Sequence, residues 1–395
     1  MTKTPPPLPR ELVKAGPGLA AQNRKFLYLL TVACFLITGG ILWDISWHQS
    51  IGRDRFLTPP HIVVYLGAIL GALSSGTHVM INSFSAKAQK DAYVKLWGIF
   101  YSSFGALFCI WGAIAMLTSA PFDNWWHTAF GLDLQILSPP HSLLLAGIFS
   151  MQTGTCLWII KYINLTSPNN RSIRPLQFLL VVTAATFLCM VYTLAISYVR
   201  VSSMRDARFY QSVTVITLLL LPGFGKALRL KWGMTAIACC YFLISASSNW
   251  ILQIFPAEPK LGPILTHTTH FQPGNFPLLI MVPAYFMDLL LQKFKGNDWI
   301  RAACLSMIFV LTLVTIQYPF SGFLRESPSS RNWFFGGDAW YYQNPPDAPF
   351  RYKFSPTEIQ PLPFFAVGIL IAIVLGMLVS LLSLTWGKWM LHIRR

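Results

Sequence analysis

Charged residues are scarce in this sequence. Asp, Glu, Lys and Arg make up 11% of its 395 residues, whereas 54% are hydrophobic and the mean hydropathy is +0.51. Average soluble domains carry about 25% charged residues, because a folded surface needs that polarity in water. The composition therefore excludes an ordinary soluble domain and indicates an integral membrane protein.

Acidic residues are the scarcest group, with 14 Asp and Glu against 30 Lys and Arg, so the formal net charge is +16. A nucleic-acid-binding chain would concentrate its basic residues in a stripe or patch. Here they are scattered through short segments between apolar runs. That distribution is typical of the loops of a membrane protein.

Spaced cysteine pairs are absent as well. All 7 cysteines fall inside apolar runs, and none belongs to a Cys-x2-Cys pair. This pattern argues against a cysteine zinc site or a disulfide framework, and it indicates thiols packed among apolar side chains.

Long apolar runs dominate what is present. Each can cross a hydrocarbon core of roughly 30 Å as a helix, and these runs do not alternate polar and apolar residues as membrane strands do. We predict an all-α bundle of about ten transmembrane helices, at residues 26–46, 61–83, 96–118, 140–160, 176–197, 210–225, 233–254, 277–292, 300–319 and 362–386. Residues 1–25 are predicted to form a cytoplasmic tail.

The basic residues predict the orientation of these helices. With the N-terminus in the cytoplasm, the inner segments hold 20 of the 30 Lys and Arg residues. This positive-inside pattern predicts a multi-pass protein of the cytoplasmic (inner) membrane with both termini inside. The same topology gathers histidines and acids on the outer, periplasmic side: Asp44, His48, His61, Asp123, His127, His141, His267 and His270.

One hairpin occurs twice among these outer residues. Residues 43–61 (WDISWHQSIGRDRFLTPPH) align with residues 122–141 (FDNWWHTAFGLDLQILSPPH) after one insertion. In each copy an Asp precedes a His by four positions, so the two share one face if the helix extends that far. Thr or Ser before Pro-Pro-His can cap the next helix, which places the second His in its first turn. Each copy thus predicts three ligands from two packed helices: Asp44, His48 and His61, then Asp123, His127 and His141.

An Asp and two His ligands with open positions suit a catalytic metal. General ligand rules leave copper, non-haem iron and zinc open. The alternative is structural, since Asp and His can hydrogen-bond each other and cap helices. That alternative is the better reading of a single Asp-x3-His pair, but the duplication with Pro-Pro-His attached favours metal binding.

At these residues the sequence resembles the C subunit of the particulate methane monooxygenase and ammonia monooxygenase family, which are copper-dependent membrane enzymes. The similarity covers residues 43–161 and is most specific at 43–61 and 122–148. The family's Asp-x3-His-x12-His motif is matched by Asp44, His48 and His61, so the resemblance implies copper there. The family's second site, of Asn, His and His, is similar to Asp123, His127 and His141, with Asp replacing Asn. A carboxylate would bind a divalent ion more strongly than an amide, because it brings a full negative charge.

Residues 232–354 are more distantly similar to the A subunit of the same family, so the chain looks like fused C and A subunits. The resemblance implies a C-like half at 26–175 and an A-like half at 176–395, with a long outer loop at 321–361. The family's cupredoxin-like B subunit has no counterpart in this sequence. We therefore expect either a separate B-like partner chain and a homo-oligomer, as in the family, or a protein that functions differently from the family.

Several further residues have two interpretations. The tryptophans that flank the ligands could shape a dry pocket or form an ordinary interfacial belt: Trp43, Trp47, Trp125 and Trp126. His267 and His270 could be accessory ligands, although a solvated pair in an outer loop is the commoner arrangement. The loop at 321–361 could cap the sites, dock a partner or serve as a plain cover.

Three functional hypotheses follow. The first is a copper-dependent membrane monooxygenase, or its catalytic core, that oxidises a small apolar or amine substrate with dioxygen. The second is a non-enzymatic membrane protein that binds or delivers copper through the same residues. The third is a haem protein with histidines from neighbouring helices, which the Asp partners argue against.

Overall fold

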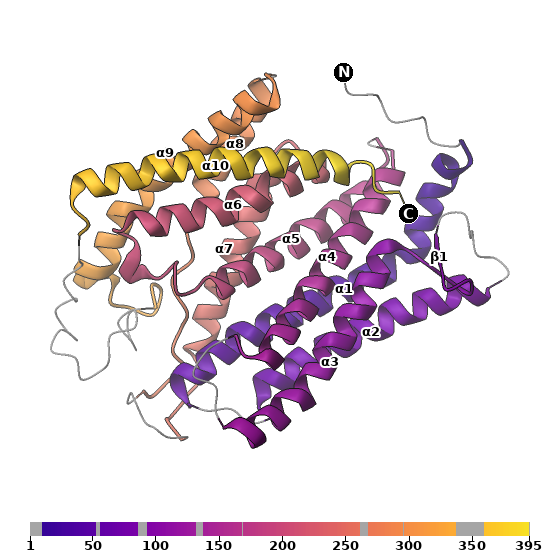
Figure 1. The fold of residues 1–395 in the computed structure, drawn as a ribbon, viewed down its shortest axis with the longest axis horizontal. Helices are drawn as coiled ribbons and strands as arrows, with labels where there is room; N and C mark the ends of the chain where they lie inside the picture. The colour runs from indigo at the N-terminus through magenta and orange to yellow at the C-terminus, as the bar shows by residue number, and fades with distance from the viewer. Residues whose placement is uncertain are drawn as a thin grey trace. The chain divides into compact units, whose positions relative to one another are not determined.

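The computed structural model describes residues 10–52, 56–85, 93–131, 137–167, 169–260, 268–294, 296–336 and 359–394, with side chains from Asn23 onward. Within these residues the chain is mostly helical, and its sheet consists of one two-stranded hairpin (Figure 1). The predicted all-α fold is thereby confirmed.

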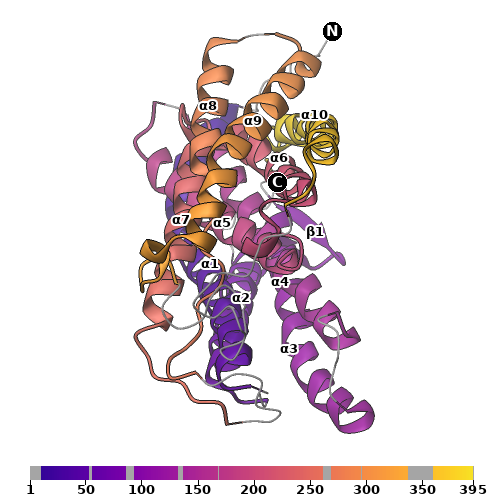
Figure 2. The same ribbon diagram turned by 90° about the vertical axis from the view of Figure 1, so that its left-hand side faces the viewer.

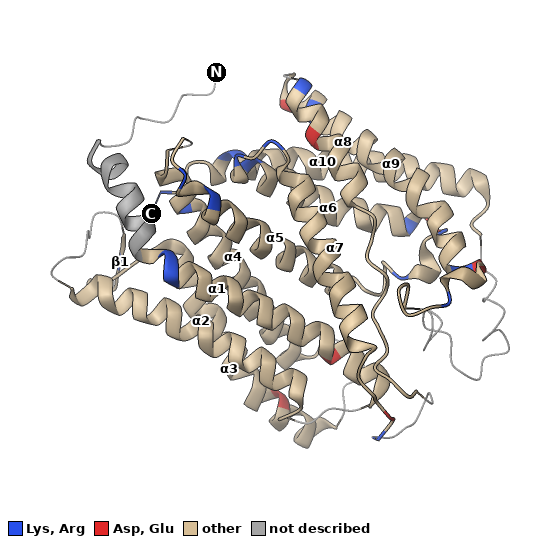
Figure 3. Cartoon of the chain, turned by 180° about the vertical axis from the view of Figure 1, so that it is seen from behind, with Lys and Arg blue, Asp and Glu red and all other residues tan. Residues whose placement is uncertain are grey.

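Ten α-helices are present in the described part of the chain. Their bounds are α1 Arg10–Ser50, α2 Pro59–Phe84, α3 Phe104–Phe130, α4 Pro139–Leu165, α5 Ile173–Leu194, α6 Ala207–Leu228, α7 Gly233–Leu252, α8 Met281–Lys293, α9 Asp298–Glu326 and α10 Leu362–Met390. All except α8 contain a segment long and apolar enough to cross a membrane, which in α1 is Asn23–Ser50. Lys, Arg, Asp and Glu are rare along the middles of these helices and gather at their ends and connections (Figure 3). The chain is a multi-pass membrane protein by length and composition.

The chain forms two compact units. Unit 1 comprises Met1–Gly40, Phe56–Phe187 and Lys388–Arg395, and unit 2 comprises Ile41–Arg55 and Leu188–Gly387. The positions of the two units relative to each other are not determined. The predicted division into halves at residues 26–175 and 176–395 stays a prediction.

Glycines allow α3 and α4 to pack closely in unit 1. Gly105 and Gly112 of α3 face Gly154 and Gly147 of α4, and a Cβ atom at Gly112 would lie 2.7 Å from the Gly147 carbonyl oxygen. Small residues of this kind let membrane helices approach backbone to backbone. The close contact fixes the positions of these two helices, which carry the second predicted metal site. All 7 cysteines are free thiols within helices, as predicted.

The start of the third predicted helix is wrong. Residues Val94–Leu96 and Phe100–Ser102 pair as the antiparallel strands β1 and β2, and α3 begins only at Phe104. Trp97 and Gly98 have φ values of 49° and 74° in the turn between the strands, which is incompatible with a right-handed helix. Ser103 then caps α3 by accepting a hydrogen bond from Ala106 N at 3.2 Å. The predicted boundary was wrong because it followed the apolar run that begins at Leu96, and this run includes the turn.

Between α7 and α9 the chain of unit 2 returns along a path that is only partly helical. After α7 the chain returns to the start of that same helix, because Asp288 of α8 accepts hydrogen bonds from Thr235 N at 2.8 Å and Thr235 Oγ1 at 2.7 Å. The 13 residues of α8 span about 20 Å at 1.5 Å per residue. The remainder of the return path is the non-helical segment Phe271–Leu279. The predicted helix 277–292 therefore begins four residues too early, since α8 starts at Met281.

Side chains from neighbouring helices satisfy the backbone of Phe271–Leu279. Non-helical backbone at membrane depth is tolerated where it is buried in protein with its polar groups paired. Four backbone N–H groups of the segment donate to side-chain oxygens: Gln272 N to Ser50 Oγ at 2.7 Å, Gly274 N to Asn249 Oδ1 at 3.1 Å, Leu278 N to Tyr241 Oη at 3.5 Å and Leu279 N to Gln317 Oε1 at 3.1 Å. Asn249 Nδ2 in turn donates to the Asn275 carbonyl at 3.0 Å. Ser46 Oγ also donates to the Gln272 carbonyl.

Helix α10 lies along α6 and α9 within unit 2 (Figures 1 and 2). Ser306 Oγ of α9 donates to the Ile373 carbonyl at 2.6 Å, and Ser383 Oγ accepts from Gly223 N of α6 at 2.9 Å. These polar contacts between apolar helices hold α10 in register.

The first span begins and the last span ends at the same end of unit 1. Asn164, near the end of α4, donates to the Met390 and Ile393 carbonyls at 2.8 and 2.9 Å. One turn earlier, Lys161 Nζ lies 4.4 Å from the ring of Tyr93, whose hydroxyl shares a hydrogen bond with Asn23 at the start of the first span. The start of the first span and the end of the last span therefore share this end of unit 1.

Candidate metal centre

The helix ends around the second predicted triad fold as the sequence indicates. Helix α3 continues past its apolar run to Phe130, so Asp123 and His127 lie one turn apart on one face. Helix α4 begins with Pro139 and Pro140, and Ser138 Oγ accepts a hydrogen bond from His141 N at 3.4 Å. His141 thus stands in the first turn of α4. In the other copy Thr58 makes no side-chain cap bond, so the predicted hydroxyl cap holds only for Ser138.

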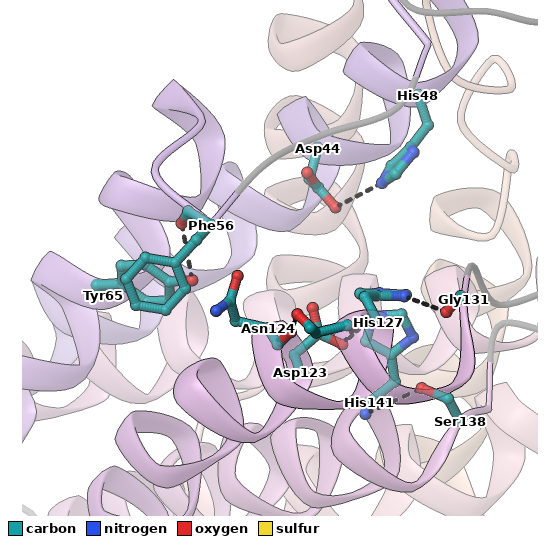
Figure 4. Close-up of polar contacts among 11 residues, drawn as sticks. Asp44, His48, Phe56, Tyr65, Asp123, Asn124, His127, Gly131, Ser138 and His141 are labelled. Carbon is teal, nitrogen blue, oxygen red and sulfur yellow. Dashed lines mark hydrogen bonds and ion pairs between the residues drawn. The ribbon is translucent and has the colours of Figure 1, made fainter.

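The three side chains of this triad converge (Figure 4). Asp123 Oδ1 lies 3.5 Å from His127 Nε2 and 3.5 Å from His141 Nε2. Ligands about 2.1 Å from a tetrahedral metal ion are about 3.4 Å from each other. Each separation is therefore one that two ligands of a single ion could have, and the chemistry of an Asp and two His suits copper, zinc or iron alike.

His127 is oriented by the end of its own helix. Its Nδ1 lies 3.0 Å from the Gly131 carbonyl oxygen. Because a carbonyl only accepts, Nδ1 carries the proton in this contact, and the Nε2 of a neutral ring turns its lone pair toward Asp123. A cation between the two groups, or a proton on Nε2, removes the repulsion that results. Metal-binding histidines are commonly held by a backbone carbonyl in this way.

Gly131 makes this contact possible through an unusual backbone conformation. It ends α3 with φ 81° and ψ −161°, a region that suits glycine alone. Gly131 belongs to neither predicted ligand set. A glycine directly after the last residue of a helix is a known C-terminal signal, so the residue was identifiable, although its carbonyl contact with His127 was not.

The three side chains converge without forming a complete set of ligands around one point. Within the described residues, no group of three or more His, Cys, Asp or Glu side chains is arranged to hold a metal ion. The two histidines point to a single carboxylate oxygen, Asp123 Oδ1, and do not surround a common centre. The side chains of Asp123, His127 and His141 are 25%, 28% and 38% exposed, which leaves them room to rotate around an ion.

The first triad is divided between the two units. Asp44 and His48 lie one turn apart at the end of α1 in unit 2, with Asp44 Oδ2 3.6 Å from His48 Nε2. His61 stands in the first turn of α2 in unit 1, with its ring 6.0 Å from that of Tyr65. The predicted helical placement of all three residues is thereby confirmed. Their assembly into one site stays a prediction.

The flanking tryptophans differ between the copies. Trp43 and Trp47 pack against a buried cluster in unit 2, with ring centroids 6.5 and 6.0 Å from Phe271. Trp125 is 55% exposed and stacks on Phe122, as an interfacial residue does. Trp126 packs on Phe130 with ring centroids 4.5 Å apart.

His270 is exposed, and its Nδ1 lies 3.1 Å from Thr269 Oγ1. It forms an isolated antiparallel bridge with Pro256. Its predicted companion His267 lies outside the described residues, as does most of the predicted outer loop, at 337–358.

No family model, curated protein or solved structure matches this chain. The similarity to the methane and ammonia monooxygenase family therefore rests on the motifs at 43–61 and 122–148 and stays a prediction.

Proposed function

We propose that this chain is a copper-dependent membrane monooxygenase, or the membrane core of one, that oxidises a small apolar or amine substrate with dioxygen. The observation that supports this function best is the convergence of His127 and His141 on Asp123, with His127 held by the Gly131 carbonyl. The duplicated motif adds a second set, Asp44, His48 and His61. Zinc and non-haem iron are the alternative metals for the same donors.

Bound copper would supply the activation of dioxygen. The residues of the chain have other tasks. Asp123 offsets positive charge at the site, and the two imidazoles present nitrogen donors from different helices. Gly131 keeps the ring of His127 in one orientation by accepting its Nδ1 proton.

Apolar side chains beside the triad suit an apolar substrate. Phe130 and Leu137, which flank the connection between α3 and α4, are 65% and 59% exposed. In a membrane such residues face lipid, so a small apolar molecule dissolved in the bilayer would reach the triad without crossing water. A dry approach also limits side reactions of activated oxygen.

Copper binding or delivery without catalysis is the second candidate. Its support is the exposure of the three donors, 25% to 38%, because a protein that passes metal on needs accessible ligands. Under either function we propose that the site faces the periplasm and that the chain lies in the cytoplasmic membrane. A separate B-like partner chain and a homo-oligomer are further proposals that rest on the family resemblance.

The test combines metal analysis with turnover in the complex purified from membranes. We expect copper, and we expect oxygen consumption coupled to product for the monooxygenase. His141→Ala should lower the copper content and abolish turnover. His392→Ala is the matched control, because the Nδ1 of His392 also contacts a backbone carbonyl, that of Lys388 at 2.7 Å.

The outcomes separate the hypotheses. Copper that is lost in His141→Ala, without oxygen consumption in the parent, would support delivery. Equal copper content in the parent and in His141→Ala would refute both the monooxygenase and the copper-delivery function at this site. Co-purification of a second chain would identify the partner.

A further inference from the structure

A cavity of about 250 Å³ in unit 2 lies where α6 ends, α7 begins, α8 ends and α9 begins. The metal sites and the proposed chemistry make no use of it. Its lining includes four basic side chains, Lys226, Arg229, Lys231 and Arg301. Among the described residues of the lining, Asp288 is the one acid. An excess of positive charge around a cavity of this size points to an anionic ligand.

Asp288 lines the cavity with its carboxylate held by the start of α7. Both of its carboxylate oxygens accept hydrogen bonds from the start of α7, where the donors are Met234 N at 3.4 Å and Thr235 N at 2.8 Å. Asp298 is the other acid nearby, with Oδ1 3.9 Å from Arg301 Nη1. The basic side chains therefore outnumber the acids that face them.

The walls of the cavity are held in place. Gln292 Nε2 of α8 donates to the Lys231 carbonyl at 2.8 Å, which ties the connection between α6 and α7 to α8. The rings of Trp232 and Tyr285 stack with centroids 5.1 Å apart and planes inclined by 3°. A preformed site loses less entropy when its ligand binds.

Arg229 occupies a conformation that favours glycine. It ends α6 with φ 55° and ψ 30°, in the left-handed region. A long side chain is unfavourable there, and such strain is often kept where the side chain has a task. Glycine adopts this backbone conformation without strain. Arg229→Gly therefore removes the positive charge of the side chain and preserves the end of α6.

The surroundings favour a lipid over a soluble anion. Helices α6, α7, α9 and α10, which contribute to the lining, are candidate membrane spans, and the cavity lies at their ends. Trp299 and Ile300, next to Arg301 in sequence, are 56% and 48% exposed. Tryptophan at helix ends is typical of the membrane interface, and basic pockets between helices at that depth bind phospholipid head groups.

We propose that this cavity binds the phosphate group of an anionic phospholipid. Lys226, Arg229, Lys231 and Arg301 supply the positive charge, and the acyl chains lie against the apolar surface beyond the cavity. A free phosphate ion shares the same chemistry, so the experiment must distinguish the two sources.

Native mass spectrometry of the purified protein, equilibrated with equal amounts of phosphatidylglycerol and phosphatidylcholine, tests the proposal. We expect the parent protein to retain phosphatidylglycerol selectively. Retention should fall about fivefold in Arg229→Gly and in Arg301→Gln, because that is the factor expected for losing one basic side chain near an anionic lipid. Lys293→Gln is the matched control, because Lys293 lines a groove on another face of α8. Thermal unfolding of Arg229→Gly should occur no lower than in the parent.

Equal retention in Arg229→Gly, Arg301→Gln and Lys293→Gln would overturn the proposal, and so would retention without preference for the anionic lipid. A second arm offers inorganic phosphate alone and records its thermal stabilisation of the protein. Stabilisation by inorganic phosphate, without retention of phosphatidylglycerol, would overturn the lipid assignment.

Discussion

Asp123 Oδ1 and His141 Nε2 lie 3.5 Å apart although they belong to different helices. The close packing of α3 on α4 through facing glycines brings their ends together, and His127 completes the group from the next turn of α3. The geometry depends on helix ends and not on a flexible loop. Changes at those ends should therefore alter metal binding without unfolding the bundle.

Gly131→Ala should weaken metal binding at the second site by about tenfold, the lower end of the usual effect of losing an outer-shell contact. A side chain is unfavourable at φ 81°, so the carbonyl that holds His127 Nδ1 would move. Metal titration would measure the change. Gly98→Ala is the control, because it places a side chain at φ 74° in the β1–β2 turn; equal loss of affinity in both variants would contradict the role of Gly131.

His48→Ala should remove the metal held by the first triad and leave the fold intact. The side chain of His48 is 49% exposed at the end of α1, so its loss costs little packing. We expect lower copper content per chain at an unchanged thermal unfolding temperature. His392→Ala serves as the exposed control, and an unaltered copper content in His48→Ala would rule out the first site.

Cysteine labelling should determine the orientation. Lys95→Cys lies in β1 of unit 1, and we expect it to resist an impermeant thiol reagent in intact cells, because the basic residues predict a cytoplasmic location. Gly336→Cys should react. The native thiols need to be replaced or shown to be silent first, and the reverse labelling pattern would overturn the periplasmic location of both metal sites.

Asn249→Ala should destabilise the protein by about 1–3 kcal/mol, the usual cost of leaving a buried polar group unsatisfied. Its side chain both accepts from Gly274 N and donates to Asn275 O, so one substitution removes two supports of the extended segment. Thermal unfolding in detergent would record the loss. Ser248→Ala is the neighbouring control, and equal stability of the two variants would show that the segment does not depend on Asn249.

The parts of the fold that could be predicted are those set by the bilayer and by local chemistry. A membrane-crossing run must be apolar over its full length, so α2, α4 and α10 could be located closely. Ser138-Pro139-Pro140 encodes the start of α4 in consecutive residues, and His141 follows from it. The helical positions of all six proposed ligands could be predicted for the same reason.

The remainder depends on partners distant in sequence. The predicted helix 277–292 included the last residues of segment Phe271–Leu279, whose extended form depends on Asn249 and Gln317, which only the folded chain brings near. The contact between His127 and the Gly131 carbonyl depends on the geometry of one helix end. Neither feature produces a periodic pattern in the sequence from which it could be predicted.

The extended segment also constrains how the protein is made. A helix can leave the translocation channel for lipid by itself, because it pairs its own backbone, but Phe271–Leu279 cannot. Its hydrogen-bonding partners include Asn249 of α7, synthesised before it, and Gln317 of α9, synthesised after it. The segment must therefore stay in a protein-lined or aqueous setting until α9 has been made, so it reaches its final place during biogenesis only after both helices that support it are present.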